Sequence, residues 1–309
     1  MKIVVFGPEK RLGVLSGDRI IDLNRANAGL PSRLDAFIAA GRGALDAAQR
    51  AIETAGKDAV LDARGVKLHA PWAGKRIAMV GGNYADHLAG MIANQHGTSV
   101  TGDALQAAYR DAREKGHWGF WKVLDELAGP DDEITYPSKR TRYLDYEGEV
   151  AIVIGKRGKD ISASQIADYV WGVTLVNDWS IRDNMGQARA MSYNTAKNFD
   201  GSCSMGPCIV AGELDFQNVD AETRVNGEQR QRFNSKDMIF KFGEVLEFLS
   251  RDFTFAPGDV ISGGTAAGTA ADRTRRNPDG TRPTELFLKV GDVVEVSSPQ
   301  IGTIRNKLV

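Results

Sequence analysis

The chain is poor in cysteine, and its hydrophobic residues form no long runs. Only Cys203 and Cys208 occur among 309 residues, so the sequence holds neither a disulfide framework nor a set of thiolates for zinc. Their spacing does not match a C-x-x-C redox motif, and we expect both to be small packing residues. The apolar run 3–6 is broken by Gly7-Pro8 before it reaches the length of a signal sequence, and no run approaches a membrane span. These absences predict a cytoplasmic protein that does not bind membranes.

The chain also lacks an excess of charge of either sign. It has 39 Lys and Arg against 40 Asp and Glu, interspersed, for a formal net charge of -1. Nucleic acid is therefore not an expected partner. Internal repeats are absent, and the glycine-rich stretch 263–268 lacks the Lys-Ser or Lys-Thr of a phosphate-binding loop. The composition, 42% hydrophobic and 26% charged, is that of a soluble protein with room for a large domain and a smaller one.

The chain does have two glutamates one residue apart at the start of a strongly apolar run. Glu147 and Glu149 precede residues 150–154, and because side chains alternate along a strand, both should share one face. Two carboxylates are not buried side by side without a cation between them. Asp178 ends the β-branched run 171–176, which predicts a neighbouring buried strand. We therefore predict that these three carboxylates bind Mg²⁺, or else Mn²⁺ or Ca²⁺, in preference to zinc.

The alternative is that the two glutamates are solvated at a strand edge and bind no ion. The general rarity of buried charge favours this alternative when the pair is considered alone. Several short blocks downstream favour the metal site. They are Asp178-Trp179-Ser180-Ile181-Arg182-Asp183, Lys197-Asn198-Phe199-Asp200, Met205-Gly206-Pro207, Val225-Asn226-Gly227-Glu228, Pro257-Gly258-Asp259, Gly264-Thr265-Ala266-Ala267-Gly268 and Gly291-Asp292-Val293. In that order, from about Ile77 to the C-terminus, they resemble the fumarylacetoacetate hydrolase family.

The resemblance implies an α+β, mostly β fold, namely the family's mixed β-roll or sandwich, in a homodimer. The expected division is a small N-terminal α+β domain at 1–72 and a catalytic domain at 73–309, with a helical insertion at about 92–118. Within these parts, the patterns predict strands at 2–6, 11–15, 19–23 and 77–80, and one broken or two short helices over 34–55. Further helices are predicted at 162–169, at 238–249, and after a cap at Asp103.

The same resemblance assigns roles to five further residues. His87 would be the general base, which suits a neutral imidazole whose pKa lies near neutral pH. Lys197 would lie near the metal and offer a compact charge to a developing oxyanion. Arg182 and Thr265 would contact the substrate carboxylate, and Tyr84 would form a wall of the pocket. His69, His96 and His117 match no family position, and we expect them to be structural.

The sequence departs from the family at two positions that concern water. Hydrolytic relatives carry a glutamate three residues after the histidine, where this chain has Gly90, and many carry a glutamine where it has Met185. Both changes remove groups that would hold a water molecule. Candidates to take over from these missing groups are Asp86, Asp103, Glu114 and His117.

The resemblance implies a metal-dependent hydrolase that cleaves a C–C bond in a β-diketo acid, such as an acylpyruvate, through an enolate stabilised by the ion. The substrate would be a small 2-oxo carboxylate of aromatic compound catabolism. The two departures keep other reactions of an enolate open: isomerisation or tautomerisation of a 2-hydroxydienoate, and decarboxylation of an oxaloacetate-type acid. A scaffold protein without activity is a further alternative. The insertion is either a surface helix or a lid over the metal.

Overall fold

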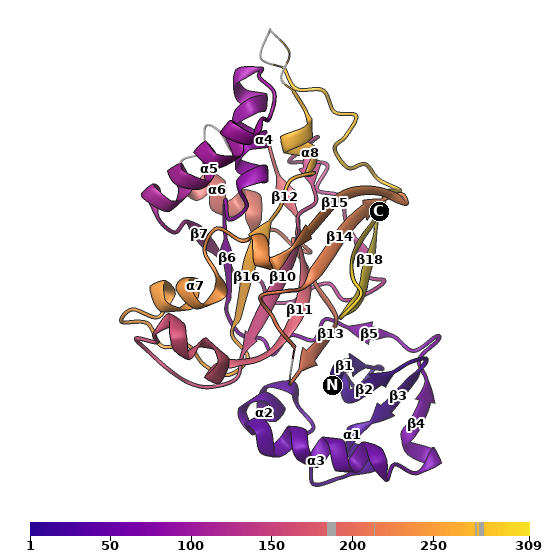
Figure 1. Ribbon diagram of the computed structural model, residues 1–309. Helices are drawn as coiled ribbons and strands as arrows, with labels where there is room; N and C mark the ends of the chain where they lie inside the picture. The colour runs from indigo at the N-terminus through magenta and orange to yellow at the C-terminus, as the bar shows by residue number, and fades with distance from the viewer. Residues whose placement is uncertain (184–189, 213, 276, 278–280) are drawn as a thin grey trace.

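The fold is built around one long mixed sheet (Figure 1). The computed structural model describes residues 1–183, 190–212, 214–275, 277 and 281–309. The strands of the long sheet are β1 (Lys2–Phe6), β2 (Arg11–Ser16), β3 (Arg19–Asp22), β4 (Val60–Asp62), β5 (Leu68–His69), β6 (Ile77–Val80), β7 (Gly119–Lys122), β10 (Gly148–Ile154), β11 (Val170–Asp178), β13 (Cys203–Ala211) and β16 (Val260–Thr265). They run in the order β4-β3-β2-β1-β13-β11-β10-β16-β6-β7, and β5 pairs with β1. The strands predicted in the first 80 residues are therefore confirmed.

A smaller sheet packs against the long one. Its strands are β8 (Glu133–Ile134), β14 (Asp220–Val225), β15 (Glu228–Asn234), β17 (Val293–Ser298) and β18 (Gly302–Leu308), in the order β15-β14-β17-β18-β8. Val150 and Ile152 of β10 share a buried cluster with Val296 and Ile304 of this sheet. One part of the core thus lies between two sheets, and another lies between the long sheet and the helices over residues 34–53, which confirms the α+β, mostly β fold. A third, two-stranded sheet pairs β9 (Leu144–Asp145) with β12 (Ser180–Ile181).

The helices lie around the sheets. They are α1 (Leu23–Ala26), α2 (Leu34–Ala39), α3 (Gly41–Glu53), α4 (Ala85–His96), α5 (Gly102–Lys115), α6 (Ala190–Lys197), α7 (Phe242–Leu249) and α8 (Ala270–Arg273), with 3-10 turns at Lys57–Ala59, Ala163–Asp168 and Ser235–Asp237. The break expected in the helical stretch 34–55 is confirmed, because α2 ends at Ala39 and α3 begins at Gly41, which has φ +63°. Strand β1 pairs directly with β13, so the N-terminal strands extend the main sheet. The division into two domains stays a prediction. Within the described residues, no helix has both the length and the apolar character needed to span a bilayer.

Two predicted helix starts are wrong. Helix α5 is capped by Thr101, not Asp103, because the Thr101 hydroxyl accepts a hydrogen bond from the backbone N–H of Ala104 at 3.2 Å. The helix expected from residue 238 begins at Phe242, because the backbone of Phe240 is bound by the side chain of Asn83. Helix α4 begins at Ala85, before the helical insertion expected from about residue 92, and its unpredicted first part carries His87.

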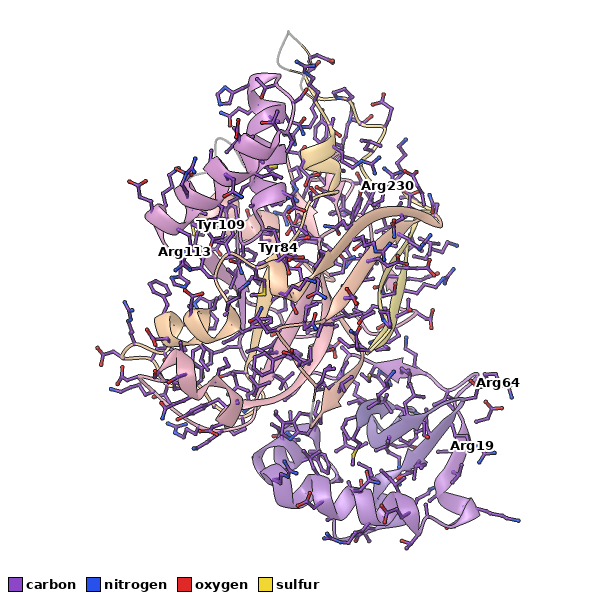
Figure 2. The ribbon with its side chains drawn as sticks, viewed as in Figure 1. Arg19, Arg64, Tyr84, Tyr109, Arg113 and Arg230 are labelled. Carbon is purple, nitrogen blue, oxygen red and sulfur yellow. The ribbon has the colours of Figure 1, made fainter. Side chains whose placement is uncertain are left out.

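The inserted segment is tied to the body of the protein at its C-terminal end. Arg113 of α5 donates a hydrogen bond to Glu244 of α7 at 2.7 Å, and Figure 2 shows its side chain above that helix. The Trp118 ring lies directly on Gly81, where a Cβ would come within 1.5 Å of it. Trp118 also packs edge-on against Tyr193 of α6, with ring centroids 5.3 Å apart. The segment therefore reaches the elements that carry the candidate site, and its role as a lid stays a prediction.

We predict that Asn83→Ala lowers the free energy of unfolding by about 2–4 kcal/mol. The buried Asn83 amide donates to Phe240 O at 3.1 Å and Gly263 O at 2.8 Å, and accepts from Phe240 N at 2.8 Å. Its loss leaves these backbone groups unpaired in the core. Urea denaturation measures the effect, with Asn218→Ala as the control, because that exposed amide accepts one hydrogen bond from Asn234. Equal losses in the two variants would contradict the prediction.

Candidate metal centre

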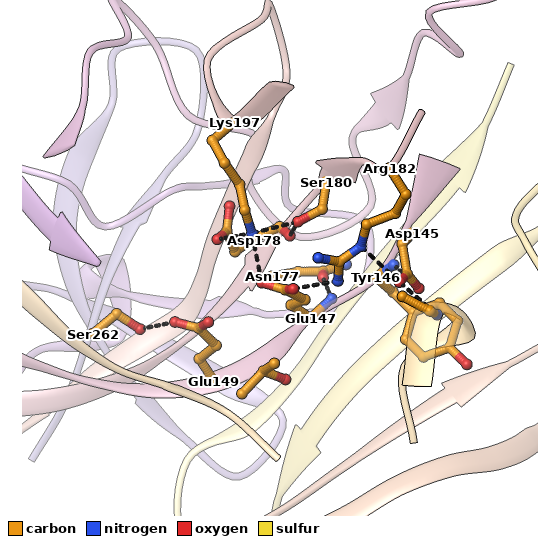
Figure 3. Close-up of polar contacts among 12 residues, drawn as sticks. Asp145, Tyr146, Glu147, Glu149, Asn177, Asp178, Ser180, Arg182, Lys197 and Ser262 are labelled. Atoms are coloured by element: carbon orange, nitrogen blue, oxygen red, sulfur yellow. Dashed lines mark hydrogen bonds and ion pairs between the residues drawn. The ribbon is translucent and has the colours of Figure 1, made fainter. Parts of the chain in front are cut away.

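Three buried carboxylates converge at the end of strand β11. Glu147, Glu149 and Asp178 each offer an oxygen, and these atoms lie within 4.8 Å of one another (Figure 3). Strands β10 and β11 are antiparallel with Gly148 opposite Asn177, which brings Asp178 beside Glu147. The backbone N–H of Asp178 donates to Glu147 O at 2.9 Å. The predicted convergence of the three carboxylates is confirmed, and we call them the acidic trio.

Two cationic side chains predicted for the site contact the acidic trio. Lys197 Nζ lies 2.7 Å from Glu147 Oε2 and 2.7 Å from Asp178 Oδ2, and Arg182 Nη2 donates to Glu147 Oε1. Burial alone would raise the pKa of Glu147, but Arg182 and Lys197 outweigh it and hold that pKa well below its usual range. Burial would likewise lower the pKa of Lys197, but Asp178 and Glu147 raise it above its usual value. Both groups are therefore ionised at neutral pH.

A second buried lysine, which the sequence analysis missed, contacts the trio from strand β7. Lys122 Nζ lies 2.7 Å from Asp178 Oδ1 and also donates to the backbone carbonyls of Ser202 and Lys197. Alternation along β7 places Phe120 on the same face as Lys122, and Lys197 Nζ lies 5.2 Å from the centre of the Phe120 ring. An ammonium group thus lies 2.7 Å from each oxygen of Asp178. The alternation in Phe-Trp-Lys indicated the face of Lys122, but not its partner.

Glu149 is buried beside two like charges, those of Asp178 and Glu147. Burial raises its pKa well above the usual value, and the charges of Asp178 and Glu147 raise it further, against a hydrogen bond from the Ser262 hydroxyl. A cation bound by the trio would favour the ionised form and displace this proton. Three carboxylate oxygens in a buried site fit Mg²⁺, Mn²⁺ or Ca²⁺, which are hard ions that prefer oxygen ligands. The donor set of the trio therefore fits the predicted ion.

His87, on α4, is paired with an acid from a distant part of the chain. Its Nδ1 lies 2.9 Å from Asp272 Oδ2, and both side chains are buried. A carboxylate can only accept, so Nδ1–H donates and Nε2 is left as the acceptor of a neutral ring. Burial lowers the pKa of His87, but the hydrogen bond and charge of Asp272 outweigh it, so the pKa is raised. Asp272 is in turn held by the backbone N–H of Gly268.

None of the four residues expected to take over from the missing groups is the partner of His87 Nδ1, which is Asp272. Asp86 Oδ1 accepts from the backbone N–H of His87 at 2.7 Å, and Asp103 and Glu114 are exposed. The His117 ring stacks with Phe240 and Phe248, at centroid distances of 4.1 and 4.5 Å.

The absence of a side chain at Gly90 leaves room for Asp272 beside His87. A Cβ at Gly90 would lie 3.1 Å from Cβ of Asp272, so the absence of a side chain lets α8 pack against α4. The sequence held a signal for α8, because Thr269 and Asp272 have the spacing of a capping box, and the Thr269 hydroxyl accepts from the backbone N–H of Asp272.

The remaining predicted residues lie around the trio. Thr265 is opposite Glu149 in the pairing of β16 with β10, and its hydroxyl donates to Gly148 O at 3.0 Å and accepts from Gln231 at 2.7 Å. Tyr84 is buried, and burial together with the charge of Glu149 raises its pKa. Their contacts with substrate stay predictions, and Met185 lies outside the described residues.

His69 and the two cysteines have the surroundings expected of structural residues. His69 Nε2 lies 2.8 Å from Gly7 O. Cys203 and Cys208 are buried and unpaired, and burial raises the pKa of each thiol to about 12. Their predicted role in packing is confirmed.

Comparisons of sequence and of structure with known proteins point to the same family. Residues 76–309 match the family described as fumarylacetoacetate (FAA) hydrolase C-terminal. The mitochondrial oxaloacetate tautomerase fahd2 of Xenopus laevis is 31% identical over 318 residues, which cover 100% of this chain and 90% of that protein. The oxaloacetate tautomerase YisK of Bacillus subtilis (strain 168) is 34% identical over 247 residues, covering 79% of this chain and 73% of that protein. Among solved structures, the fumarylacetoacetate hydrolase of Exiguobacterium antarcticum aligns with a TM-score of 0.77 and 29% identity, covering 100% and 99% of the two chains. The chain belongs to the fumarylacetoacetate hydrolase family, as its ordered sequence blocks predicted.

We predict that Glu149→Gln removes the stabilisation that Mg²⁺ or Mn²⁺ gives the protein. Without metal, the free energy of unfolding should change by less than about 1 kcal/mol, because a neutral group replaces a carboxyl whose pKa is already raised. Ion at 100 times its dissociation constant should stabilise the unchanged protein by about 2.7 kcal/mol and the variant hardly at all. Calorimetric titration and thermal unfolding measure this, with exposed Glu133→Gln as the control. A variant that the ion stabilises as strongly as the unchanged protein would remove Glu149 from the ligand set.

Proposed function

We propose that this protein is a divalent-metal-dependent tautomerase that interconverts the enol and keto forms of a 2-oxo dicarboxylic acid of the oxaloacetate kind. One observation carries the proposal: a buried His87–Asp272 pair accompanies the acidic trio in a chain whose relatives of similar length are named oxaloacetate tautomerases. Tautomerisation was one of the alternatives that the sequence left open. The relatives favour it over the hydrolase reaction, which the sequence analysis placed first.

The reaction moves one proton and changes no other atoms. In the enol-to-keto direction, the enol oxygen loses its proton, its C–O bond becomes C=O, the C=C bond becomes single, and the neighbouring carbon gains a proton. In this proposal, Nε2 of His87 takes up a proton from one position and returns one to the other, so the ring ends in the form in which it began. Asp272 keeps Nδ1 protonated, so that Nε2 remains the reacting atom throughout.

The other residues stabilise negative charge that develops on the substrate. A divalent ion bound by Glu147, Glu149 and Asp178 would supply positive charge next to a substrate oxygen. Lys197 adds a compact charge at the same place, and its high pKa keeps it protonated. Arg182 presents a guanidinium group, which suits a carboxylate. Because these groups are buried, their interactions with charge are stronger than they would be in water.

Tautomerisation suits the departures from the family pattern better than hydrolysis does. Hydrolysis of a C–C bond requires a water molecule held and activated at the carbonyl carbon. Asp272 takes the place of the acid missing at Gly90, but Met185 stands where many relatives carry a glutamine near that water. Decarboxylation needs no water either, and it remains an alternative on the same residues. The scaffold alternative has less support, because the relatives cited above are named as enzymes.

The proposed activity predicts that the protein with Mg²⁺ speeds the loss of the ultraviolet absorbance of enol-oxaloacetate. His87→Asn should lower kcat by about 10²–10⁴. His117→Asn is the matched control, because that ring lies in an aromatic stack away from the trio. NMR of the products separates the alternatives, since pyruvate and carbon dioxide would indicate a decarboxylase and cleaved acylpyruvate a hydrolase. Metal binding without turnover of any of these acids would favour the scaffold.

Asp272→Asn should change the pH profile in a defined direction. Asp272 raises the pKa of His87, so its loss should lower that pKa and keep the ring neutral to lower pH. The acid limb of kcat/KM should therefore move to lower pH, while the plateau falls about 10-fold or more because the ring is no longer fixed. Rate measurements across pH with Mg²⁺ held saturating test this. An acid limb that stays in place or moves to higher pH would contradict the assigned partner.

A further inference from the structure

Asp145 is a fully buried carboxylate outside the acidic trio, and four N–H groups converge on it. Its Oδ1 accepts from the backbone N–H of Tyr146 at 3.0 Å and of Ala270 at 2.8 Å. Its Oδ2 accepts from Arg182 Nε at 3.0 Å and from the backbone N–H of Ala271 at 3.0 Å. The Asp145 side chain therefore contacts both Arg182, which binds the acidic trio, and the start of α8, which carries the partner of His87.

The first contact leads to the acidic trio. Arg182 follows β12, which pairs with β9 so that Ser180 lies opposite Asp145. While Nε of Arg182 donates to Asp145, its Nη2 donates to Glu147 (Figure 3). A guanidinium group is planar and rigid, so fixing one edge fixes the direction of the other. Asp145 thereby sets how Arg182 meets a predicted metal ligand.

The second contact leads to His87. Ala270 and Ala271 are the first two residues of α8, and the next residue, Asp272, is the partner of His87. Helix α8 has only four residues, so its own backbone hydrogen bonds cannot hold it in place. The two hydrogen bonds to Asp145 fix the turn from which Asp272 reaches Nδ1 of His87.

We propose that Asp145 is a positioning residue that orients two groups at once: Arg182 against Glu147, and Asp272 against His87. The assignment of a catalytic effect rests on the proposed function, but the two orientations do not. The alternative is that Asp145 only satisfies buried N–H groups and contributes stability alone.

Asp145→Asn tests this, because it keeps the size of the side chain and replaces one acceptor oxygen by a donor. Three measurements are made: the low-field NMR resonance of the His87 Nδ1 proton, the Mn²⁺ affinity by calorimetry, and kcat and KM with enol-oxaloacetate. We expect the resonance to shift upfield or broaden, the Mn²⁺ affinity to fall about 10-fold, and kcat to fall about 10–10² with a smaller change in KM.

Ala270→Pro separates the two contacts. It removes one N–H donor to Asp145 at the first helical position, where proline is tolerated, and Thr269 before it has φ -62° and ψ 159°, which suits a residue preceding proline. The His87 resonance should change as in Asp145→Asn and kcat should fall, while the Mn²⁺ affinity stays within about 2-fold of the unchanged protein. In the double variant Ala270→Pro with Asp272→Asn, the effects on kcat should not multiply, because the contact of Ala270 with Asp145 acts through Asp272.

Asp22→Asn is the matched control. Asp22 is a buried carboxylate that also accepts from an arginine, Arg11 at 2.8 Å, and from the backbone N–H groups of a helix start, Asn24 at 3.2 Å and Arg25 at 3.1 Å. It should lose stability without changing the three measurements. If Asp145→Asn leaves the His87 resonance and Mn²⁺ affinity unchanged, or if kcat effects multiply in the double variant, the positioning role is wrong. If both orientations change as expected in a protein inactive toward oxaloacetate, the inference stands and the proposed function fails.

Discussion

The burial of three carboxylates within 4.8 Å of one another is the constraint to which the rest of the site responds. Removing even one ion from water costs several kcal/mol unless it is paired. Glu147 is paired with Arg182 and Lys197, and Asp178 with Lys197 and Lys122. Burial and the charges of Asp178 and Glu147 raise the pKa of Glu149, so this carboxylate binds a proton more tightly. The three cations come from β7, α6 and the residue after β12, so the site depends on the convergence of these distant segments.

The acidic trio and its strands could be predicted because their signals are local. Alternation places Glu147 and Glu149 on one face, and a β-branched run ending in Asp178 indicates the neighbouring strand. Lys122, Asp145 and Asp272 could not be found in this way. Each makes its decisive contact across a long stretch of chain, such as the 185 residues that separate His87 from Asp272. The late start of α7 has the same origin, since a remote side chain, Asn83, holds the backbone before it.

The pairing of His87 illustrates how a departure in sequence can be compensated in space. An acid three residues after the histidine would lie one turn along the same helix, and the pair would form whenever the helix does. Here the acid belongs to α8, and Gly90 leaves the room that α8 occupies. The orientation of the histidine therefore depends on tertiary packing. Residues that hold α8 in place affect His87 although they are distant from it in sequence.

The charges around the trio also bear on which reaction the site can favour. Every oxygen of Glu147 and Asp178 already faces an ammonium or guanidinium group, and the histidine ring is held by a buried carboxylate. Such a site stabilises negative charge on a bound acid with little rearrangement, because its dipoles and charges are already oriented. A proton transfer within one molecule requires only this stabilisation and one group that can bind and release a proton. A hydrolytic reaction would require, in addition, a water molecule held against the carbonyl carbon, and Met185 stands where many relatives carry a glutamine near that water.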